Sequence, residues 1–454
     1  MLNLFDDWQR GSIDLVRSQK IAGIKVPTVV INDDGFLPAE VDSPIKQYRK
    51  QTGEPLYFDQ VQVPRFWQIK GDASGAQVYD LNTKRAEIRF FKNDNTRFVK
   101  QVEWLNAAGE LQWIDQYDQH GQRFAKTFYA KGQAKLKQYY DAAQNVVIDH
   151  HLTTDDIFLY TGGRQRHFAN WLELTADFLQ SSDYQLDHVI YNTLNLAFFT
   201  TLKLPSENAS DVLVWQEGLG DELPGNMRFI FENQTRTKQI WMQNHQAWVQ
   251  YQEKFAKPVA VDSQSMDVKV QQLGTIYPHP RGNQMRPAIL IMTNSDQIEM
   301  LSVLAARLKN FDFHIAALTE MSEKLLQIGE QANVHLYPAV SFAKAKQLMA
   351  DCDIYLDINH GDQIMDAVRA AFENNQLILG FNDTLHLPEL VAPDNRYDET
   401  QLDAMIEKLL LAMVKPAVME QLIDSQREFA GDAKVETYQK RFNELRFENG
   451  NAQD

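Results

Sequence analysis

The feature that most constrains the fold of this chain is a regular alternation of apolar runs and helical stretches after Arg286. Short apolar runs such as Ala288–Met292 and Leu377–Leu379 are separated by segments that each fit one helix. A strand that is apolar on both faces needs cover on both, so the pattern predicts a parallel sheet with helices on each side. Right-handed crossovers make it a Rossmann-like lobe. We expect this lobe at residues 286–420, followed by a C-terminal helix and tail at 421–454.

Two earlier parts of the chain show the same alternation of short apolar runs and helical stretches. After a helical stretch at the N-terminus, short β-branched or aromatic runs recur. They predict buried strands at Val26–Ile31, His188–Asn192, Asp211–Trp215, Phe229–Phe231 and Gln239–Trp241. We therefore expect an N-terminal Rossmann-like lobe built from residues 1–41 and 172–285, with Tyr277–Asn283 as the linker between the lobes.

Between these two segments, residues 42–171 change to the period of a β-strand. Turn signals recur at intervals of eleven or twelve residues and once more after a longer gap. Two of them open with Asn or Asp and close with Gly, which accepts the positive φ that tight hairpins need. They lie at Asn106–Gly109, Asp118–Gly121, Ala130–Gly132, Asp141–Gln144 and Thr161–Arg164. The sequence therefore predicts an inserted antiparallel β-meander, a kind of sheet that commonly keeps one face solvated.

The predicted meander differs in charge from the rest of the chain. The whole chain carries −16, but the window from Lys84 to Lys137 holds eleven Lys or Arg against six Asp or Glu. In Leu111–Tyr117, Leu111, Trp113 and Tyr117 share one face, although Ile114 and Asp115 interrupt the alternation. A solvated face is one interpretation; a surface that binds a partner or acceptor is the other, since aromatic residues and Arg anchor interfaces. The candidates are Arg97, Trp104, Trp113, Tyr117, Arg123, Lys126 and Lys135.

The first candidate ligand loop of the second lobe lacks the groups that usually bind phosphates. The first βα turn, Met292–Glu299, has no glycine and no basic residue. Its polar residues Asn294, Ser295 and Asp296 are expected to cap a helix over Gln297–Leu308.

The fourth βα turn places Gly361 where a backbone could approach closely, beside His360, which is a turn residue or a general base. Glu217, Asp221 and Glu222 are surface acids or an acid pair for sugar chemistry. The residual cleft would thus hold Glu217, Asn294, Ser295, His360 and Gly361. We predict no catalytic residue.

The composition of the chain limits the classes of partner it can bind and the cellular compartment in which we expect it. An acidic chain argues against a nucleic-acid-binding protein. A lone cysteine, Cys352, excludes an intrachain disulfide, and Asp149–His151 is a poor metal site because adjacent strand residues point to opposite faces. Met1–Trp8 is acidic where a signal peptide is basic, and no run of about 18 apolar residues occurs. We expect no metal and a cytoplasmic protein, with any membrane contact peripheral on the cytoplasmic face.

Two α/β lobes with a helical C-terminal tail resemble the B-type glycosyltransferase architecture. Retaining members carry an Arg and a Lys after the first strand of the second lobe, and two glutamates eight positions apart near the fourth βα turn. Here the basic pair has no match in Thr293–Glu299, and Ile358 and Asp366 stand where the glutamates would be. Losing these groups would remove most of the stabilisation of a nucleotide diphosphate leaving group.

A closer resemblance covers nearly the whole chain. The sequence is similar to the glycosyltransferase-stabilising proteins of the accessory Sec system in Gram-positive bacteria. The stretches that carry this resemblance are Val29–Pro38, Trp215–Met227, Thr293–Glu299, His314–Ser322, Asp353–Gly361 and Ala370–Asn375.

This resemblance implies a non-catalytic subunit of a hetero-oligomer, with a heterotetramer as one arrangement. The partner subunit would bind the UDP-sugar and transfer N-acetylglucosamine to Ser and Thr of a serine-rich repeat adhesin before export by accessory Sec components. This chain would bind no cofactor; it would stabilise the transferase and bind the acceptor polypeptide. Two alternatives stay open: an active UDP-sugar-dependent retaining glycosyltransferase that uses Glu217 or Glu222 and His360, and a translocase scaffold that never contacts acceptor.

Overall fold

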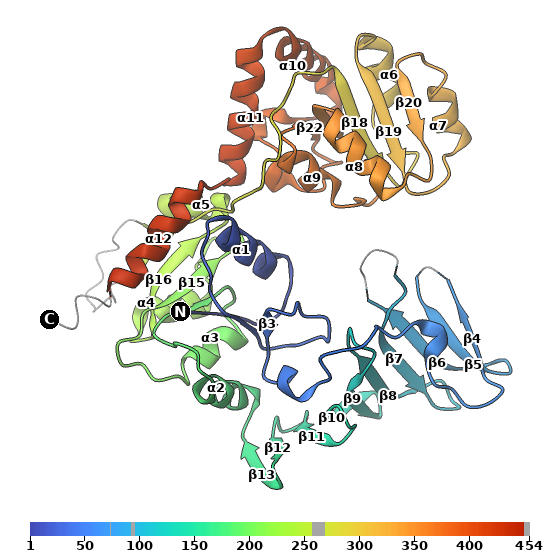
Figure 1. The fold of residues 1–454 in the computed structure, drawn as a ribbon. Coiled ribbons are helices and arrows are strands. Elements are labelled where there is room, and N and C mark those ends of the chain that lie inside the picture. Colours follow the sequence, from blue (N-terminus) through green and yellow to red (C-terminus); the bar gives the residue numbers. More distant parts are fainter. Residues whose placement is uncertain (73, 92–95, 257–267, 449–454) are drawn as a thin grey trace.

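The computed structural model describes residues 1–72, 74–91, 96–256 and 268–448. Lys92 and Asp94, which belong to the basic window, and the predicted tail at 449–454 lie outside these residues. In the described part of the chain the strands form three sheets (Figure 1), which we call the first-lobe sheet, the meander sheet and the second-lobe sheet.

The first-lobe sheet is parallel, with strand order β17-β16-β15-β14-β1-β2-β3. Alternating side chains of β1 enter opposite cores, with Leu2 and Leu4 on one face and Phe5 on the other. The strands are β1 (Leu2–Phe5), β2 (Thr28–Val30), β3 (Val41–Asp42), β14 (Val189–Tyr191), β15 (Asp211–Trp215), β16 (Thr237–Met242) and β17 (Lys269–Gln272). The helices are α1 (Arg10–Ile21), α2 (Trp171–Ser181), α3 (Leu196–Thr201), α4 (Gly225–Glu232) and α5 (His245–Lys254).

Two sequence predictions for this lobe are wrong. The chain begins with strand β1, and the helix predicted at the N-terminus starts only at Arg10. Phe229–Phe231 lies in helix α4, because Met227 and Ile230, three positions apart, are buried while Phe229 is 41% exposed. That spacing marks one face of a helix, which a three-residue apolar run cannot reveal.

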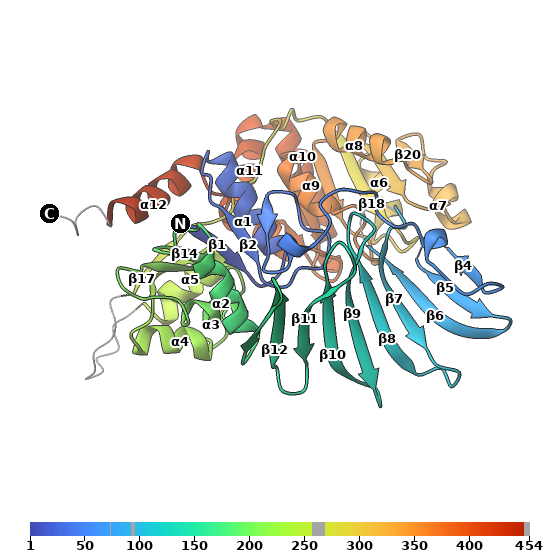
Figure 2. The same cartoon turned by 60° about the horizontal axis from the view of Figure 1, so that its bottom comes forward.

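The meander sheet runs in sequence order from β4 to β13, with every neighbouring pair antiparallel. The predicted turns are confirmed, and Gly109, Gly121 and Gly132 adopt the positive φ that these hairpins require. Figure 2 shows the sheet fanning away from the first lobe, with β12 near α2 and β4 far from it. The strands are β4 (Gln68–Gly71), β5 (Ala76–Asp80), β6 (Thr83–Phe90), β7 (Val99–Leu105), β8 (Leu111–Tyr117), β9 (Arg123–Ala130), β10 (Gln133–Tyr140), β11 (Val146–His151), β12 (Ile157–Thr161) and β13 (Arg164–Phe168).

The second-lobe sheet is parallel in the order β20-β19-β18-β21-β22-β23, as the apolar runs predict. Helices α6 and α10 pack on one face, and α8 and α9 on the other. The strands are β18 (Ala288–Thr293), β19 (Asp312–Ala317), β20 (Val334–Tyr337), β21 (Ile354–Asp357), β22 (Leu377–Phe381) and β23 (Arg396–Tyr397). The helices are α6 (Leu301–Arg307), α7 (Glu323–Ile328), α8 (Phe342–Asp351), α9 (Ala367–Glu373), α10 (Leu402–Val414), α11 (Pro416–Ala430) and α12 (Val435–Glu448).

The chain returns to the first lobe at its end. Helix α12 lies beside α1 and the first-lobe sheet (Figure 1), and its Tyr438, Phe442 and Leu445 are fully buried in that lobe. Tyr438 donates to the Gly274 carbonyl, which ties the helix to the segment before the linker. The two lobes are therefore joined twice, by the linker and by α12.

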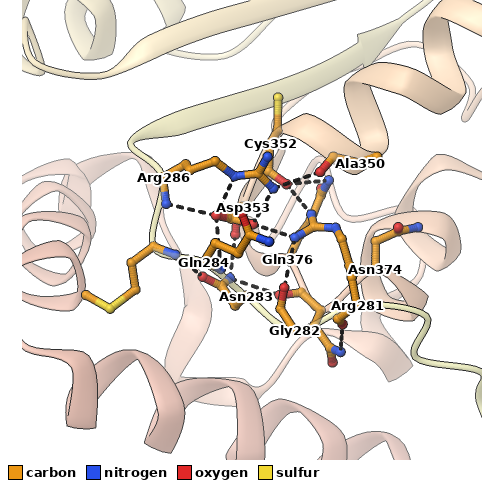
Figure 3. Close-up of polar contacts among 12 residues, drawn as sticks. Arg281, Gly282, Asn283, Gln284, Arg286, Ala350, Cys352, Asp353, Asn374 and Gln376 are labelled. Atoms are coloured by element: carbon orange, nitrogen blue, oxygen red, sulfur yellow. Dashed lines mark hydrogen bonds and ion pairs between the residues drawn. The ribbon is translucent and has the colours of Figure 1, made fainter.

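The linker is anchored to the second lobe by one carboxylate (Figure 3). Asp353 is fully buried and accepts hydrogen bonds from Arg281 Nη1 at 2.5 Å, from Arg286 Nε at 3.0 Å and from the Arg286 backbone at 2.8 Å. Burial alone would raise the pKa of Asp353, but the hydrogen bonds from Arg286 and Arg281 hold it below the ordinary value. The ionised Asp353 side chain thus holds the linker residues to the lobe, together with hydrogen bonds from Arg281, Asn283 and Arg286 to backbone carbonyls of the lobe.

Replacing this carboxylate should cost much of the stability of the chain. We expect Asp353→Asn to lower the free energy of unfolding by about 3 kcal/mol, because two cations lose their buried partner. Urea denaturation of the purified chain measures the change. Asp351→Asn, at an exposed position two residues earlier, is the matched control; equal midpoints for the two variants would contradict the anchoring role.

Candidate functional site

One face of the meander sheet carries a continuous row of aromatic and polar side chains, which we call the strip. On β9 to β12 the adjacent residues Ala125, Tyr139, Ile148 and Leu159 point the other way, into the core shared with the first lobe. On β5 to β7 the face of the strip is covered by residues 56–67, which pack on Val78, Ala86 and Val102. The strip is the continuation of that face, and its members are Trp104, Trp113, Asp115, Arg123, Lys126, Gln138, Tyr140, Asp149 and Tyr160.

Asp115 organises the first half of the strip. Its Oδ2 accepts hydrogen bonds from the indole of Trp104 at 2.8 Å and from that of Trp113 at 3.2 Å. Its Oδ1 lies 3.5 Å from the Arg123 guanidinium and 3.9 Å from Lys126 Nζ. Only 8% of its side chain is exposed, so these contacts form in a partly dehydrated environment where they are stronger than on open surface.

Two cations of this half lie over aromatic rings. Lys126 Nζ is 4.5 Å from the centre of the Trp113 ring, and burial lowers the pKa of Lys126 from its ordinary value. The Arg123 guanidinium is 4.7 Å from the centre of the Tyr140 ring. Such cation–π contacts are favourable when desolvated, and here the second one joins the two halves of the strip.

The second half is a chain of hydrogen bonds. The Tyr140 hydroxyl donates to Gln138 Oε1 at 3.0 Å, and Gln138 Nε2 donates to Asp149 Oδ1 at 2.9 Å. The Tyr160 hydroxyl donates to Asp149 Oδ2 at 3.0 Å. With two carboxylates and two cations, the strip as a whole is electrically neutral.

The structure brings together only part of the predicted binding set. Trp104, Trp113, Arg123 and Lys126 meet in the strip. Tyr117, at the end of β8, is the cross-strand partner of Arg123 and, like Trp104, packs against the covered part of the sheet; its burial raises its pKa to about 12. The two remaining candidates, Arg97 and Lys135, lie elsewhere.

Arg97 is exposed in the β6–β7 connection, and Lys135 Nζ donates to Gln133; among the described contacts neither joins the strip. Sequence reasoning missed Asp115, Gln138, Tyr140, Asp149 and Tyr160. The spacing of two residues between Trp113 and Asp115, and between Gln138 and Tyr140, was the available signal, because it places each pair on one face of a strand.

A cavity of about 450 Å³ lies between the lobes. Glu217 lines it, together with residues of α1, α9 and the segment after β16. Ion pairs between α1 and α9 cross from lobe to lobe beside it. Arg369 binds Asp14 through two hydrogen bonds of 2.7 and 2.6 Å, and Arg17 Nη1 binds Glu373 at 2.9 Å.

Asp366, which the sequence resemblance aligns with the second glutamate of retaining enzymes, also lies at this boundary. Arg10 of α1 binds it at 3.4 Å. The carboxylate of the second lobe is therefore held by a cation of the first.

The crevice at the topological switch point of the second lobe is closed by its own loops. Such crevices, where strand order reverses, are where open α/β sheets bind ligands; here it lies between β18 and β21. The loops after these strands bind each other, since Thr293 Oγ1 donates to Asn359 Oδ1 at 2.6 Å and the His360 amide donates to the Gln297 carbonyl at 3.0 Å. A Cβ on Gly361 would lie 1.9 Å from Asn294 Oδ1, so the close approach predicted for Gly361 is to this chain itself.

The capping role predicted for Asn294, Ser295 and Asp296 is wrong. Helix α6 begins later, at Leu301, and Met300 precedes it in the left-handed region with φ 51°. Ser295 instead makes local turn contacts, accepting from the Gln297 amide at 3.0 Å. The segment before α6 instead forms bends and a turn around a single β-bridge between Ile298 and Asn359.

The residues of the predicted residual cleft are not in one place. His360 lines a separate cavity of about 320 Å³, where its Nε2 lies 2.7 Å from Glu299 Oε2. Asn294, Ser295 and Gly361 contact one another at the closed crevice, away from Glu217 in the cavity between the lobes.

The acids of the loop after β15 have surface partners. Asp221 pairs with Lys254 and Glu222 with Arg228, and both acids are largely exposed. The described side chains include no group of three or more His, Cys, Asp or Glu residues that could hold a metal ion.

His386 fixes the loop that closes the crevice. Its Nδ1 lies 2.5 Å from Asp357 Oδ1, and its Nε2 lies 2.7 Å from the Gly361 carbonyl oxygen. Because both partners are acceptors, only the doubly protonated ring can donate to both. The hydrogen bond to Asp357 raises the pKa of His386 above its ordinary value, although burial opposes it.

This geometry makes part of the stability of the second lobe dependent on pH. A raised pKa in the folded state contributes stability that is complete below about pH 6.5, the ordinary value for histidine, and is lost as pH rises through the folded pKa. We expect His386→Gln, which is neutral at every pH, to lose roughly 1 kcal/mol at acidic pH and to flatten this dependence. Urea denaturation at several pH values measures both the loss of stability and its pH dependence. The control is His335→Gln, which removes a histidine that pairs with Asp312 on the surface. An unchanged pH profile in His386→Gln would overturn the assignment.

Comparison with known proteins gives matches along the whole chain. Family models match in four segments: the GtfB N-terminal domain at residues 2–48, the GtfB middle domain at 67–169, the GtfB third domain at 172–253 and the GftB/GlyA-F C-terminal domain at 289–426. The UDP-N-acetylglucosamine–peptide N-acetylglucosaminyltransferase stabilizing protein GtfB of Limosilactobacillus reuteri subsp. suis is 48% identical over 451 residues, which are 99% of this chain and 100% of the relative.

Solved structures agree. A chain in the crystal structure of the GtfA/B complex bound to UDP and GlcNAc matches with a TM-score of 0.89 and 38% identity, covering 98% of this chain and 99% of that one. The pneumococcal O-GlcNAc transferase GtfA, in complex with UDP and GlcNAc, matches with a TM-score of 0.57 and 13% identity over 98% of this chain and 99% of its own, which shows a shared fold. The predicted B-type architecture with an inserted antiparallel sheet is confirmed. Of the helices that the structure describes, none has the length and apolar character needed to cross a bilayer.

Proposed function

This chain belongs to the GtfB family of UDP-N-acetylglucosamine–peptide N-acetylglucosaminyltransferase stabilising proteins, and from that premise we propose that it is the non-catalytic, acceptor-binding subunit of an O-glycosyltransferase. Its partner is the catalytic subunit, which binds UDP-N-acetylglucosamine. The acceptor is the serine-rich repeat polypeptide of an adhesin, glycosylated on Ser and Thr in the cytoplasm before export by the accessory Sec system.

The observation that carries this proposal is the strip. It offers aromatic rings, hydrogen-bond donors and acceptors with no net charge, which suits an uncharged, hydroxyl-rich polypeptide better than a charged one. Its members already bind one another, so little side-chain freedom is lost when a peptide arrives.

Contacts in the second lobe support the proposal that the partner subunit, and not this chain, binds the sugar donor. At the crevice that would receive a nucleotide, the loops after β18 and β21 bind each other. The first βα turn, Thr293–Glu299, contains no Lys or Arg that could bind a diphosphate. Donor binding is therefore assigned to the partner subunit.

The alternative of an active transferase has little geometric support. Glu217 and His360 line different cavities, and Glu222 pairs with Arg228 on the surface. A general acid or base must lie within hydrogen-bond reach of the group it serves, and these residues share no such point.

The test is a kinetic assay of the chain assembled with its partner. We expect Trp113→Ala and Lys126→Ala each to raise the KM for a serine-rich acceptor about tenfold while kcat changes less than about twofold, because they remove binding that does not reach the reacting atoms. Lys135→Ala, on the same sheet outside the strip, is the control.

Two outcomes would contradict the proposal. One is an unchanged acceptor KM in both strip variants. The other is transfer of labelled sugar by the purified chain alone at a rate near that of the assembled complex.

A further inference from the structure

The strip runs across the strands and not along them. Asp115 is the cross-strand partner of Lys126, Lys126 of Gln138, and Gln138 of Asp149. Directly paired residues of neighbouring strands lie on a line roughly perpendicular to the strands. A ligand that follows the strip must therefore cross the sheet.

The length of the strip can be compared with a polypeptide. Trp104 lies on β7 and Tyr160 on β12, five strand spacings away. At about 4.8 Å per spacing the strip is about 24 Å long, whereas an extended chain rises about 3.3 Å per residue. We propose, on the premise of the acceptor-binding function above, that the strip binds a serine-rich polypeptide as an extended segment of about seven residues that crosses strands β7 to β12.

The chemistry of the strip changes along this path. In the first half a hydroxyl-rich chain meets the indoles of Trp104 and Trp113 and the cations Arg123 and Lys126. In the second half it meets the amide of Gln138 and the carboxylate of Asp149. A serine hydroxyl both donates and accepts, so it can bind in either half without a fixed sequence.

The competing mode is pairing with an open edge of the meander sheet. The two edges are β4, with four residues, and β13, with five. A strand added at an edge binds through its backbone, so its affinity would stop rising at about four or five residues and would not depend on the strip. Peptide length and strip variants together separate the two modes.

The experiment measures binding of fluorescein-labelled Ser/Ala peptides, capped at both ends and about three to eleven residues long, to the assembled complex by anisotropy. We expect affinity to rise at least about tenfold between four and seven residues and by no more than about twofold beyond, where only the number of possible registers grows. Saturation at four or five residues would overturn the crossing path.

Variants at the far end of the strip supply the second readout. Asp149→Asn should weaken a seven-residue peptide about tenfold and a four-residue peptide by at most about twofold, since the short peptide can bind the other half. Tyr160→Phe, which removes one hydroxyl, should have the same length dependence with a smaller loss. Arg164→Ala, on exposed edge strand β13, is the control and should change neither.

The outcomes distinguish the two proposals. If Trp113→Ala and Lys126→Ala do not weaken the peptides, the acceptor-binding function of the strip is wrong and the crossing path with it. If they do, but Asp149→Asn and Tyr160→Phe weaken long and short peptides equally, the strip binds acceptor and the seven-residue path is wrong.

Discussion

The ion pair between Arg369 and Asp14 fixes how the two lobes face each other. Arg369, on α9 of the second lobe, binds Asp14 of α1 and Glu373 of its own helix, and its guanidinium lies 5.3 Å from the ring centre of Tyr277 in the linker. Burial alone would lower its pKa, but these hydrogen bonds raise it. Lobes, linker and cavity thus meet at one nearly buried cation. In a glycosyltransferase such a boundary must admit a nucleotide sugar; here helix-to-helix ion pairs occupy part of it.

At the switch-point crevice, too, residues bind partners within the chain where a ligand would otherwise bind. Gly361 approaches Asn294, and Asp366 is bound by Arg10. Both residues, which the sequence resemblance places near a donor site, have a partner within the chain. In the meander sheet the strip members also bind one another, but they lie on the face opposite the core that the sheet shares with the first lobe. Under the proposed function, these contacts would let the fold serve as a scaffold and acceptor site while the partner performs transfer.

How far the sequence predicts this structure depends on whether the deciding interaction is local. Apolar periodicity and Gly-closed turns are local, and they located both parallel sheets and the meander. Asn294, Ser295 and Asp296 carry a strong local capping signal, yet the segment forms bends, a bridge from Ile298 to the distant Asn359 and a left-handed Met300, and the helix begins only at Leu301. Phe229 was assigned to a strand because three apolar residues do not define a period.

The candidate site was only partly accessible to the same reasoning. Trp104, Trp113, Arg123 and Lys126 stood out by residue type. In the sequence Asp115 breaks the alternation of its strand, and its role is visible only in the fold, where one of its two indole donors comes from a neighbouring strand. Cross-strand partners such as Gln138 and Asp149 follow from register, which bulges between the strands alter.

The central claim, that acceptor binding lies on the meander sheet and not between the lobes, is tested most directly by photocrosslinking. A serine-rich peptide with one benzophenone residue is irradiated with the assembled complex, and the adducts are located by mass spectrometry. We expect adducts on strands β7 to β12, at or beside Trp113, Tyr140 and Tyr160. Adducts confined to the cavity between the lobes, around Arg10 and Glu217, would contradict it.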